Sequence, residues 1–221
     1  MDLMLRNGLS FCETGGRILF LDVDRDRYFC LAEQSESGFR RLVADEPKSA
    51  TDDVLLQRLV ADGLLVEGPP GERPAACLPV RRPDHSLLDE AARARPGAAV
   101  SALFRLSISN LALRVLPLRV ILARLKRRKS MLARSSAAPH GATLEIAAAF
   151  KRSSRIVSPL NLCLPRSVAA AHALLASGVR PDLVIGVRLN PFNAHCWVQC
   201  EEALINESLD EVRNFTPILV I

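Results

Sequence analysis

The 221-residue sequence lacks the marks of several classes of protein. Its first residues do not show the charged, then apolar, then small-residue pattern of a secretion signal. No uninterrupted apolar run reaches the 18 or so residues that a membrane-spanning helix needs. Its six cysteines lack the spacing of a small disulfide scaffold and include no C-x-x-C pair. We therefore expect a cytoplasmic chain with reduced thiols, no membrane span, no metal and no other cofactor.

Acidic residues are absent between Ala91 and Thr143, where 11 arginines and lysines lie. The net charge of the whole chain is only +5, so the remainder is acidic. A basic block of this kind suits an acidic partner, a membrane surface or nucleic acid, and a solvated helical face gives the same pattern. Residues 1–80 hold 14 acidic and 9 basic residues, which argues against a DNA-reading head there. We expect no nucleic acid partner.

The N-terminal third has the pattern of a small sheet followed by helices. Strand-like segments are separated by turns, and the Gly15-Gly16 pair makes the first turn. The strands are expected at 9–13, 17–22 and 28–31. Two helical patterns come next, and a short strand or wing follows at 64–66. This order is the outline of a winged helix.

Prolines then interrupt every periodic pattern and indicate a linker. We expect a recognition domain over 1–80, a linker over 81–97 and a second domain over 98–221. The second domain is predicted to be helical from about 98, with a break at Pro117 and with the basic run 126–129 as a helix end or loop. Further helices are predicted at 143–150 and 165–176, and strands at 183–187, 194–201 and 203–206. The fold class is therefore α+β, with two domains.

Two residues of the second domain combine into a reactive pattern. Cys163 stands at the entrance of a predicted helix, with Pro165 in the first turn. The unpaired amides and positive dipole of a helix N-terminus favour the thiolate of such a cysteine. His195 follows on a predicted strand and could act as the base. This order, Cys before His and helix before strand, is that of the transglutaminase-like branch of the papain-like enzymes.

The sequence resembles the leader peptidases of lasso-peptide biosynthesis, in the form that fuses a recognition domain to the peptidase. The resemblance covers about residues 140–221 and rests on several motifs in order. These are Cys163-Leu164-Pro165-Arg166-Ser167, Gly178-Val179, Leu183-Val184-Ile185-Gly186-Val187-Arg188, Pro191-Phe192-Asn193-Ala194-His195-Cys196-Trp197-Val198 and Ile205-Asn206-Glu207-Ser208. The N-terminal part resembles the winged-helix-like element that binds leader peptides, by pattern only.

The resemblance implies Cys163 as nucleophile and His195 as base of a cysteine peptidase. The family usually places Asp as the third member, and Glu207 stands there in this sequence. We expect Glu207 in this role, with Asn206 and Asp210 as the alternatives. A second departure is Gln199, where the family more often has Glu, and we expect it to be tolerated.

Further contacts are expected around this pair and in the first domain. Asn161 is a candidate oxyanion donor beside the Cys163 amide. Trp197, on the same strand face as His195, could contact substrate or shield the pair, or pack in the core. The leader should add a strand to the edge of the first sheet. The residues at that edge are Tyr28, Phe29, Cys30 and Leu31.

The function implied is removal of the leader from a lasso-peptide precursor before core cyclisation. The partners implied are the precursor's leader segment and an ATP-using cyclase. A transglutaminase-type acyl transfer, with an amine in place of water, stays open as an alternative, and so does a peptide- or DNA-binding protein without turnover. A zinc set of Cys163, His195, Cys196 and Cys200 is disfavoured, because His195 and Cys196 point to opposite faces of a strand.

Overall fold

The structure is a computed structural model that describes residues 2–47, 49–77, 81–90, 95–133, 140–153 and 162–221. The chain forms two units, Met1–Cys77 and Leu78–Ile221. The second unit includes β6 (His85–Ser86) and α3 (Leu87–Glu90), which lie within the segment expected as the linker, 81–97. β6 pairs in parallel with β9 (Ala203–Leu204). Such a two-residue strand has no periodicity of its own, and only its distant partner defines it.

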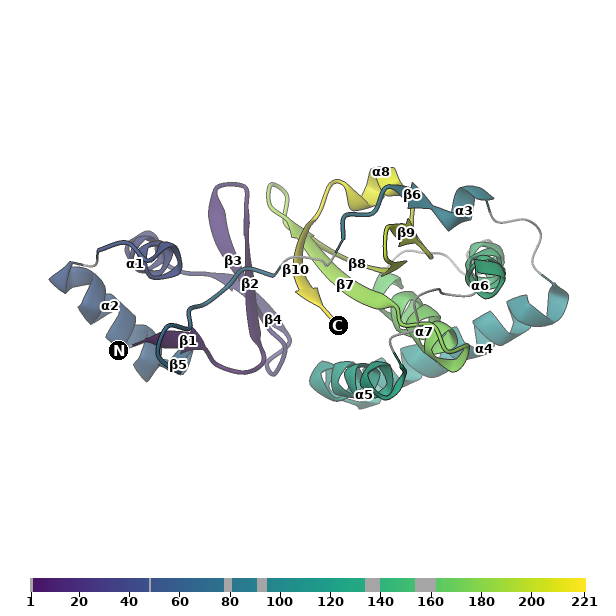
Figure 1. The fold of residues 1–221 in the computed structure, drawn as a ribbon, viewed down its shortest axis with the longest axis horizontal. Coiled ribbons are helices and arrows are strands. Elements are labelled where there is room, and N and C mark those ends of the chain that lie inside the picture. Colours follow the sequence, from purple (N-terminus) through teal and green to yellow (C-terminus); the bar gives the residue numbers. More distant parts are fainter. Residues whose placement is uncertain (1, 48, 78–80, 91–94, 134–139, 154–161) are drawn as a thin grey trace. The chain divides into compact units, whose positions relative to one another are not determined.

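The N-terminal unit contains two small antiparallel sheets and two helices (Figure 1). A meander of β2 (Leu9–Thr14), β3 (Arg17–Asp22) and β4 (Arg27–Cys30) follows β1 (Leu3–Leu5). The turn between β2 and β3 is Gly15-Gly16, both with positive φ, as the paired glycines predicted. Helices α1 (Glu33–Ala44) and α2 (Ala50–Ala61) come next, and β5 (Leu65–Glu67) pairs with β1. The strand β1 was not predicted.

Aromatic rings hold the core of this unit together. Phe11, Phe20 and Phe39 are nearly inaccessible, with ring centroids 5.1 to 5.8 Å apart. Phe29 of β4 stacks on Phe20 at 5.2 Å. These contacts join the three-stranded sheet to α1, because Phe39 lies on the buried face of that helix. Edge-to-face and offset pairs of this kind add to the stabilisation from burial alone.

The C-terminal unit is built on a five-stranded sheet of order β10-β7-β8-β9-β6. Its centre is the antiparallel pair β7 (Asp182–Arg188) and β8 (Asn193–Cys200). β10 (Thr216–Val220) pairs with β7 at one edge, and β9 pairs with only the last two residues of β8. The first six residues of β8 therefore have no strand partner on the β9 side among the described residues. This open stretch of strand edge carries the site described below.

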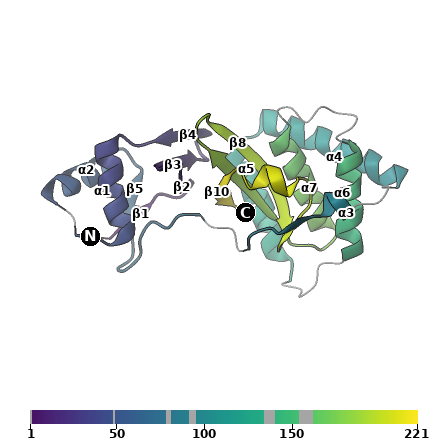
Figure 2. The same ribbon diagram turned by 90° about the horizontal axis from the view of Figure 1, so that it is seen from above.

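Helices cover the sheet of the C-terminal unit (Figures 1 and 2). α7 (Cys163–Ala176) packs against β8 and β7. α4 (Pro96–Val115) and α6 (His140–Ser153) pack against α7 and against each other, and α5 (Leu118–Met131) also contacts α7. The short α8 (Leu209–Val212) precedes β10. The apolar region over 98–125 is divided between α4 and α5 at Leu116-Pro117, as Pro117 predicted, because a proline at this point ends the helix before it.

One described helix combines the length and hydropathy that crossing a membrane would require. It is Gly97–Val115 of α4, with a mean hydropathy of 1.3 over 18 residues, and 22% of that window is buried. The buried residues Ala99, Ala102 and Leu106 recur at helical spacing on one face. α4 contacts α6 and α7, while most of this window is not buried.

Candidate active site

Cys163 is the first residue of α7, and its side chain is partly buried. The backbone N–H groups of Leu164 and Cys196 donate to its sulfur. The first of these belongs to the opening turn of α7, where amides have no helical partner. The second comes from the open edge of β8. The sulfur therefore lies where a helix N-terminus meets a strand edge, and both supply positive dipoles.

Side chains take the place of a strand along the open edge of β8. Ser167 Oγ, one turn after Cys163, donates to Cys196 O at 2.8 Å. Asn206 Oδ1 accepts from Val198 N at 2.8 Å, and Asn206 Nδ2 donates to Ser167 Oγ at 2.9 Å. Ser167 and Asn206 are both buried. This network fixes α7, which carries the thiol, against β8, which carries the imidazole.

His195 lies on β8 directly before this network, and its ring packs on a second aromatic ring. The ring centroid is 5.1 Å from that of Phe215, with an angle of 29° between the planes. His195 hydrogen bonds with Cys163 through one ring nitrogen. Nε2 contacts Glu207 Oε2 at 2.9 Å, which leaves Nδ1 for the thiol. The imidazole therefore joins the thiol to a carboxylate.

Glu207 follows β9 and turns its carboxylate toward His195. Its second oxygen, Oε1, accepts from Ser208 N at 3.0 Å, and its carbonyl accepts from Ser86 Oγ at 2.7 Å. The alternative Asn206 points into the Ser167 network, and the alternative Asp210 lies within α8. Of the three residues considered from the sequence, the structure brings only Glu207 into hydrogen bonding with His195.

The three groups shift one another's proton affinities. Burial alone would lower the pKa of His195, but hydrogen bonds and charges from Cys163 and Glu207 outweigh it and raise the pKa to about 9. Burial opposes the thiolate of Cys163, yet the hydrogen bond and charge of His195 bring its pKa below the usual 9.0. The pKa of Glu207 is lowered by the hydrogen bond from His195, against the effect of burial. The arrangement favours a thiolate–imidazolium pair backed by an ionised carboxylate.

Trp197 is a packing residue. It is 1% exposed and lies in a cluster with Val184, Leu204, Val212 and Phe215. A substrate contact, one of the roles considered from the sequence, does not fit this burial. A Cβ on Gly186 would come within 2.5 Å of the Trp197 ring, so only glycine leaves room for the indole. The indole ring centroid is 6.4 Å from that of His195.

Gln199 has a full set of partners. Its Oε1 accepts from Trp197 Nε1 at 3.1 Å. Its Nε2 donates to the carbonyls of Arg81 and Glu201 at 2.8 and 3.0 Å. An ionised Glu, the residue more usual in the resembled family, could not donate to either carbonyl. The amide fits its buried position in this chain.

Three residues around the site were not singled out for a role from the sequence. Phe215 lies in the turn before β10, and Ser167 and Arg166 are on the first turns of α7. The charge of Arg166 contributes to the lowered pKa of Glu207. A signal for Ser167 existed, because residues 163 and 167 are i and i+4 and share one helix face. No sequence signal pointed to Phe215, whose contact with His195 depends on β10 pairing with β7.

Other predicted site residues lie elsewhere. Asn161 is outside the described residues. The edge residues Tyr28, Phe29 and Cys30 belong to β4, and the buried Leu31 follows them. Among the described residues β4 pairs with β3 and is the last strand of the order β2-β3-β4. No three His, Cys, Asp or Glu side chains in the described ranges are grouped as ligands of a metal ion.

The chain was compared with protein families, curated proteins and solved structures. The model of the transglutaminase-like superfamily matches residues 108–220, which is 113 of the 221 residues. The matched region contains Cys163, His195 and Glu207. No curated protein and no solved structure matches the chain.

Proposed function

Since the chain belongs to the transglutaminase-like superfamily, whose members are cysteine peptidases and acyltransferases, we propose that it is a cysteine peptidase that removes the leader of a lasso-peptide precursor. One observation carries the chemical part of this proposal. A thiol at a helix N-terminus is hydrogen bonded to an imidazole whose Nε2 is held by Glu207 at 2.9 Å. The peptide substrate is supported by the resemblance of the 140–221 motifs to lasso leader peptidases.

The proposed reaction runs through a thioester. The Cys163 thiolate attacks the carbonyl carbon of the scissile amide and forms a tetrahedral oxyanion, which the amides of the first turn of α7 can stabilise. The amide C–N bond then breaks, and the His195 imidazolium gives its proton to the departing amine of the core peptide. Neutral His195 next takes a proton from water, whose oxygen attacks the thioester. The leader is released with a free carboxylate, and the thiolate–imidazolium pair is restored.

Glu207 acts as the third member of this set. An ionised carboxylate at Nε2 stabilises the imidazolium and keeps the ring aimed at the sulfur. Glu is one methylene longer than the usual Asp of the resembled family. The added length is accommodated by the second carboxylate oxygen, which accepts from Ser208 N at 3.0 Å.

The N-terminal unit is proposed as a winged-helix-like recognition domain for the leader. Its support is the position of β4 at the end of the three-stranded sheet, which is where an added strand pairs in this mode of recognition. Tyr28 and Cys30 are partly buried, so they can offer side-chain contacts to such a strand. Binding the leader there raises the local concentration of the cleavage site at Cys163, so the cleft itself need not bind tightly. The freed core would pass to a cyclase partner.

We place this reaction in the cytoplasm. All six cysteines are free thiols in the structure, including Cys163. A catalytic thiol remains available in a reducing compartment, where structural disulfides are rare.

The test is incubation of the full chain with a lasso precursor encoded beside its gene, followed by mass spectrometry of the products. The proposal expects two fragments whose masses sum to precursor plus one water, and none with Cys163→Ala. Adding a primary amine to the reaction distinguishes hydrolysis of the thioester from acyl transfer to an amine. Leader fragments that carry the amine in place of water would favour acyl transfer, and an intact precursor with a folded enzyme would refute leader removal.

A further inference from the structure

One face of α4 leaves large apolar side chains in solvent. The five residues recur every three or four positions and are between 51 and 71% exposed: Val100, Phe104, Ile108, Leu111 and Val115. At 100° per residue they fall within about 80° of the helix circumference and extend about 22 Å along its axis. We call this set the α4 ridge. A continuous apolar surface of this kind usually marks a site of contact with a partner or a membrane.

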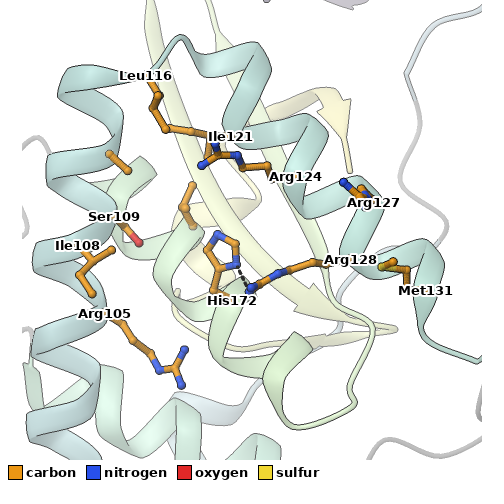
Figure 3. Close-up of a pocket in the computed structure, with 12 residues that line it drawn as sticks. Arg105, Ile108, Ser109, Leu116, Ile121, Arg124, Arg127, Arg128, Met131 and His172 are labelled. Carbon is orange, nitrogen blue, oxygen red and sulfur yellow. Dashed lines mark hydrogen bonds between the residues drawn. The ribbon is translucent and has the colours of Figure 1, made fainter.

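A groove of about 550 Å³ lies beside the ridge, between α4, α5 and α7 (Figure 3). Ile108 belongs to both the ridge and the groove. Apolar side chains line part of the groove, among them Leu116, Ile121 and Val168. Four arginines line it as well: Arg105 from α4 and Arg124, Arg127 and Arg128 from α5. We call these four the arginine set.

The groove carries uncompensated positive charge. No acidic residue lines it, and α4 and α5 contain none. Within the described residues no ion pair involves the arginine set. His172 of α7 lies among them, with its Nδ1 3.4 Å from Arg128 Nη1. Burial first, and then the charges of Arg128 and Arg105, lower the pKa of His172, which favours the neutral ring.

We propose that the α4 ridge and the arginine set dock the protein on an anionic lipid bilayer. The convex ridge enters the boundary between headgroups and acyl chains, and the arginines donate hydrogen bonds to lipid phosphates in the adjoining groove. Charge complementarity requires an anionic occupant, and a continuous apolar ridge suits acyl chains. The contact is peripheral, because the opposite face of α4 stays packed on α6 and α7. This inference is independent of the peptide substrate.

The exposed polar residues of α4 are consistent with a lipid surface. They are Ser101, Ser107 and Arg114, so no carboxylate would be brought against anionic headgroups. The alternative occupant is an acidic segment of a partner protein. Such a partner would also pair with the arginines. The two occupants are distinguished by vesicles of lipid alone, to which a protein that docks only an acidic segment should not bind.

The test is flotation of the full chain with vesicles. One set contains phosphatidylcholine alone, and the other contains phosphatidylcholine and phosphatidylglycerol in equal parts. The protein should float only with the anionic vesicles, and less so at high salt, because salt screens the attraction. A folded protein that stays unbound in both cases would overturn the proposal, and this is also the outcome if the true occupant is an acidic protein segment.

Two variants separate the contribution of the α4 ridge to vesicle binding from that of the arginine set. Phe104→Ser with Leu111→Ser removes apolar area from the ridge, and Arg124→Gln with Arg127→Gln and Arg128→Gln removes three charges from the groove. Each should weaken vesicle binding at least about 10-fold. The matched control is Arg58→Gln with Arg152→Gln and Arg213→Gln, which lowers the net charge equally at exposed sites elsewhere and should bind nearly as wild type.

The outcomes of the variants decide the proposal. If the groove variant binds as tightly as its charge-matched control, the attraction is non-specific and the proposal is wrong. If the ridge variant binds as wild type, the ridge does not enter the bilayer and the proposal is equally wrong. Because the ridge side chains are exposed, their replacement should leave the fold intact, and Val115→Ser alone supplies a milder version. Peptide cleavage without lipid should be unchanged in every variant.

Discussion

Both units pair carboxylates with a basic side chain, but the partners and the burial differ, since Glu207 is only partly buried. In the N-terminal unit Asp22, Glu36 and Asp52 are at most 4% exposed, and each meets an arginine. In the C-terminal unit Glu207 meets His195, whose other nitrogen faces a thiol. The pKa of Glu36 is lowered and so is that of Glu207, with burial opposing the shift in both cases. A lowered carboxylate pKa therefore does not by itself identify a site of chemistry.

The difference lies in what the partner can do with a proton. An arginine keeps its proton at any ordinary pH, so the pair of Arg17 and Glu36 serves only to hold β3 against α1. A histidine can gain and lose a proton near neutral pH. His195 can therefore take the proton of the Cys163 thiol and later return it. A carboxylate paired with a basic side chain thus fixes a fold in one unit and supports a reaction in the other.

Replacing the nucleophile should abolish the function assigned to one unit and leave the function assigned to the other unit intact. Cys163→Ala should abolish precursor cleavage, because no other thiol can reach the scissile carbonyl in the same geometry. Binding of a labelled leader, followed by fluorescence anisotropy, should survive, because it is assigned to the N-terminal unit. Loss of both activities in a folded protein would contradict this division of labour.

Removing the acid behind His195 should slow the reaction without stopping it. Glu207→Ala should cost at least about 10-fold in single-turnover rate, or roughly 1.4 kcal/mol of transition-state stabilisation. Glu207→Asp should be largely active, because it keeps the carboxylate. Asn206→Ala should cost less in rate than Glu207→Ala, since Asn206 contacts the backbone and not the imidazole. A dead Asn206→Ala with a normal Glu207→Ala would reverse the assignment.

The structural acids should affect stability and not the chemical step. Glu36→Ala should lower the free energy of unfolding of the N-terminal unit by roughly 1–3 kcal/mol, because the buried Ile18 N–H loses its acceptor. Glu207→Ala should destabilise less, because its partner His195 can become neutral. Urea unfolding followed by circular dichroism measures both, with each unit fitted as its own transition. Equal losses in the free energy of unfolding for the two variants would show that the two acids do not differ in their structural role.

The pH profile gives the smallest and most specific effect. A raised His195 pKa means that the imidazolium persists until the pH rises through about 9. A lowered Cys163 pKa means that the thiolate is present below its usual 9.0. Cleavage should therefore decline on the alkaline side near pH 9, and Glu207→Gln should move this limb to lower pH, because an amide stabilises the imidazolium less. If the alkaline limb of the pH profile is the same in Glu207→Gln as in the wild type, Glu207 does not set the pKa of His195.

Local patterns in the sequence predicted much of this molecule. The paired glycines at 15 and 16 predicted the first hairpin turn, and Pro165 predicted a helix beginning near Cys163. Hydrophobic periodicity and turn-forming residues depend on a few neighbouring positions, so they can be recognised without knowing the fold. The short strands β1, β6 and β10 were missed because each is defined by a partner far along the chain.

The site was predictable to a similar extent. Cys163, His195 and Glu207 could be named as candidates because the motifs that resemble the lasso leader peptidases contain them. The Ser167–Asn206 network and the stacking of Phe215 on His195 could not, because they join segments 39 and 20 residues apart. Trp197 illustrates the limit, since strand alternation placed it on the face of His195 but could not show that the face is buried at that point.

The central claim is that His195 and Glu207 hold Cys163 as a thiolate. Iodoacetamide alkylation across a pH series, with each cysteine followed by peptide mass mapping, tests this claim without any substrate. Cys163 should react with a pKa below its usual 9.0, while Cys12 and Cys200, whose pKa values burial raises to about 12, serve as slow internal controls. In His195→Ala the Cys163 pKa should rise. A Cys163 that titrates at or above 9.0 in the wild type, and does not respond to His195→Ala, would contradict the account.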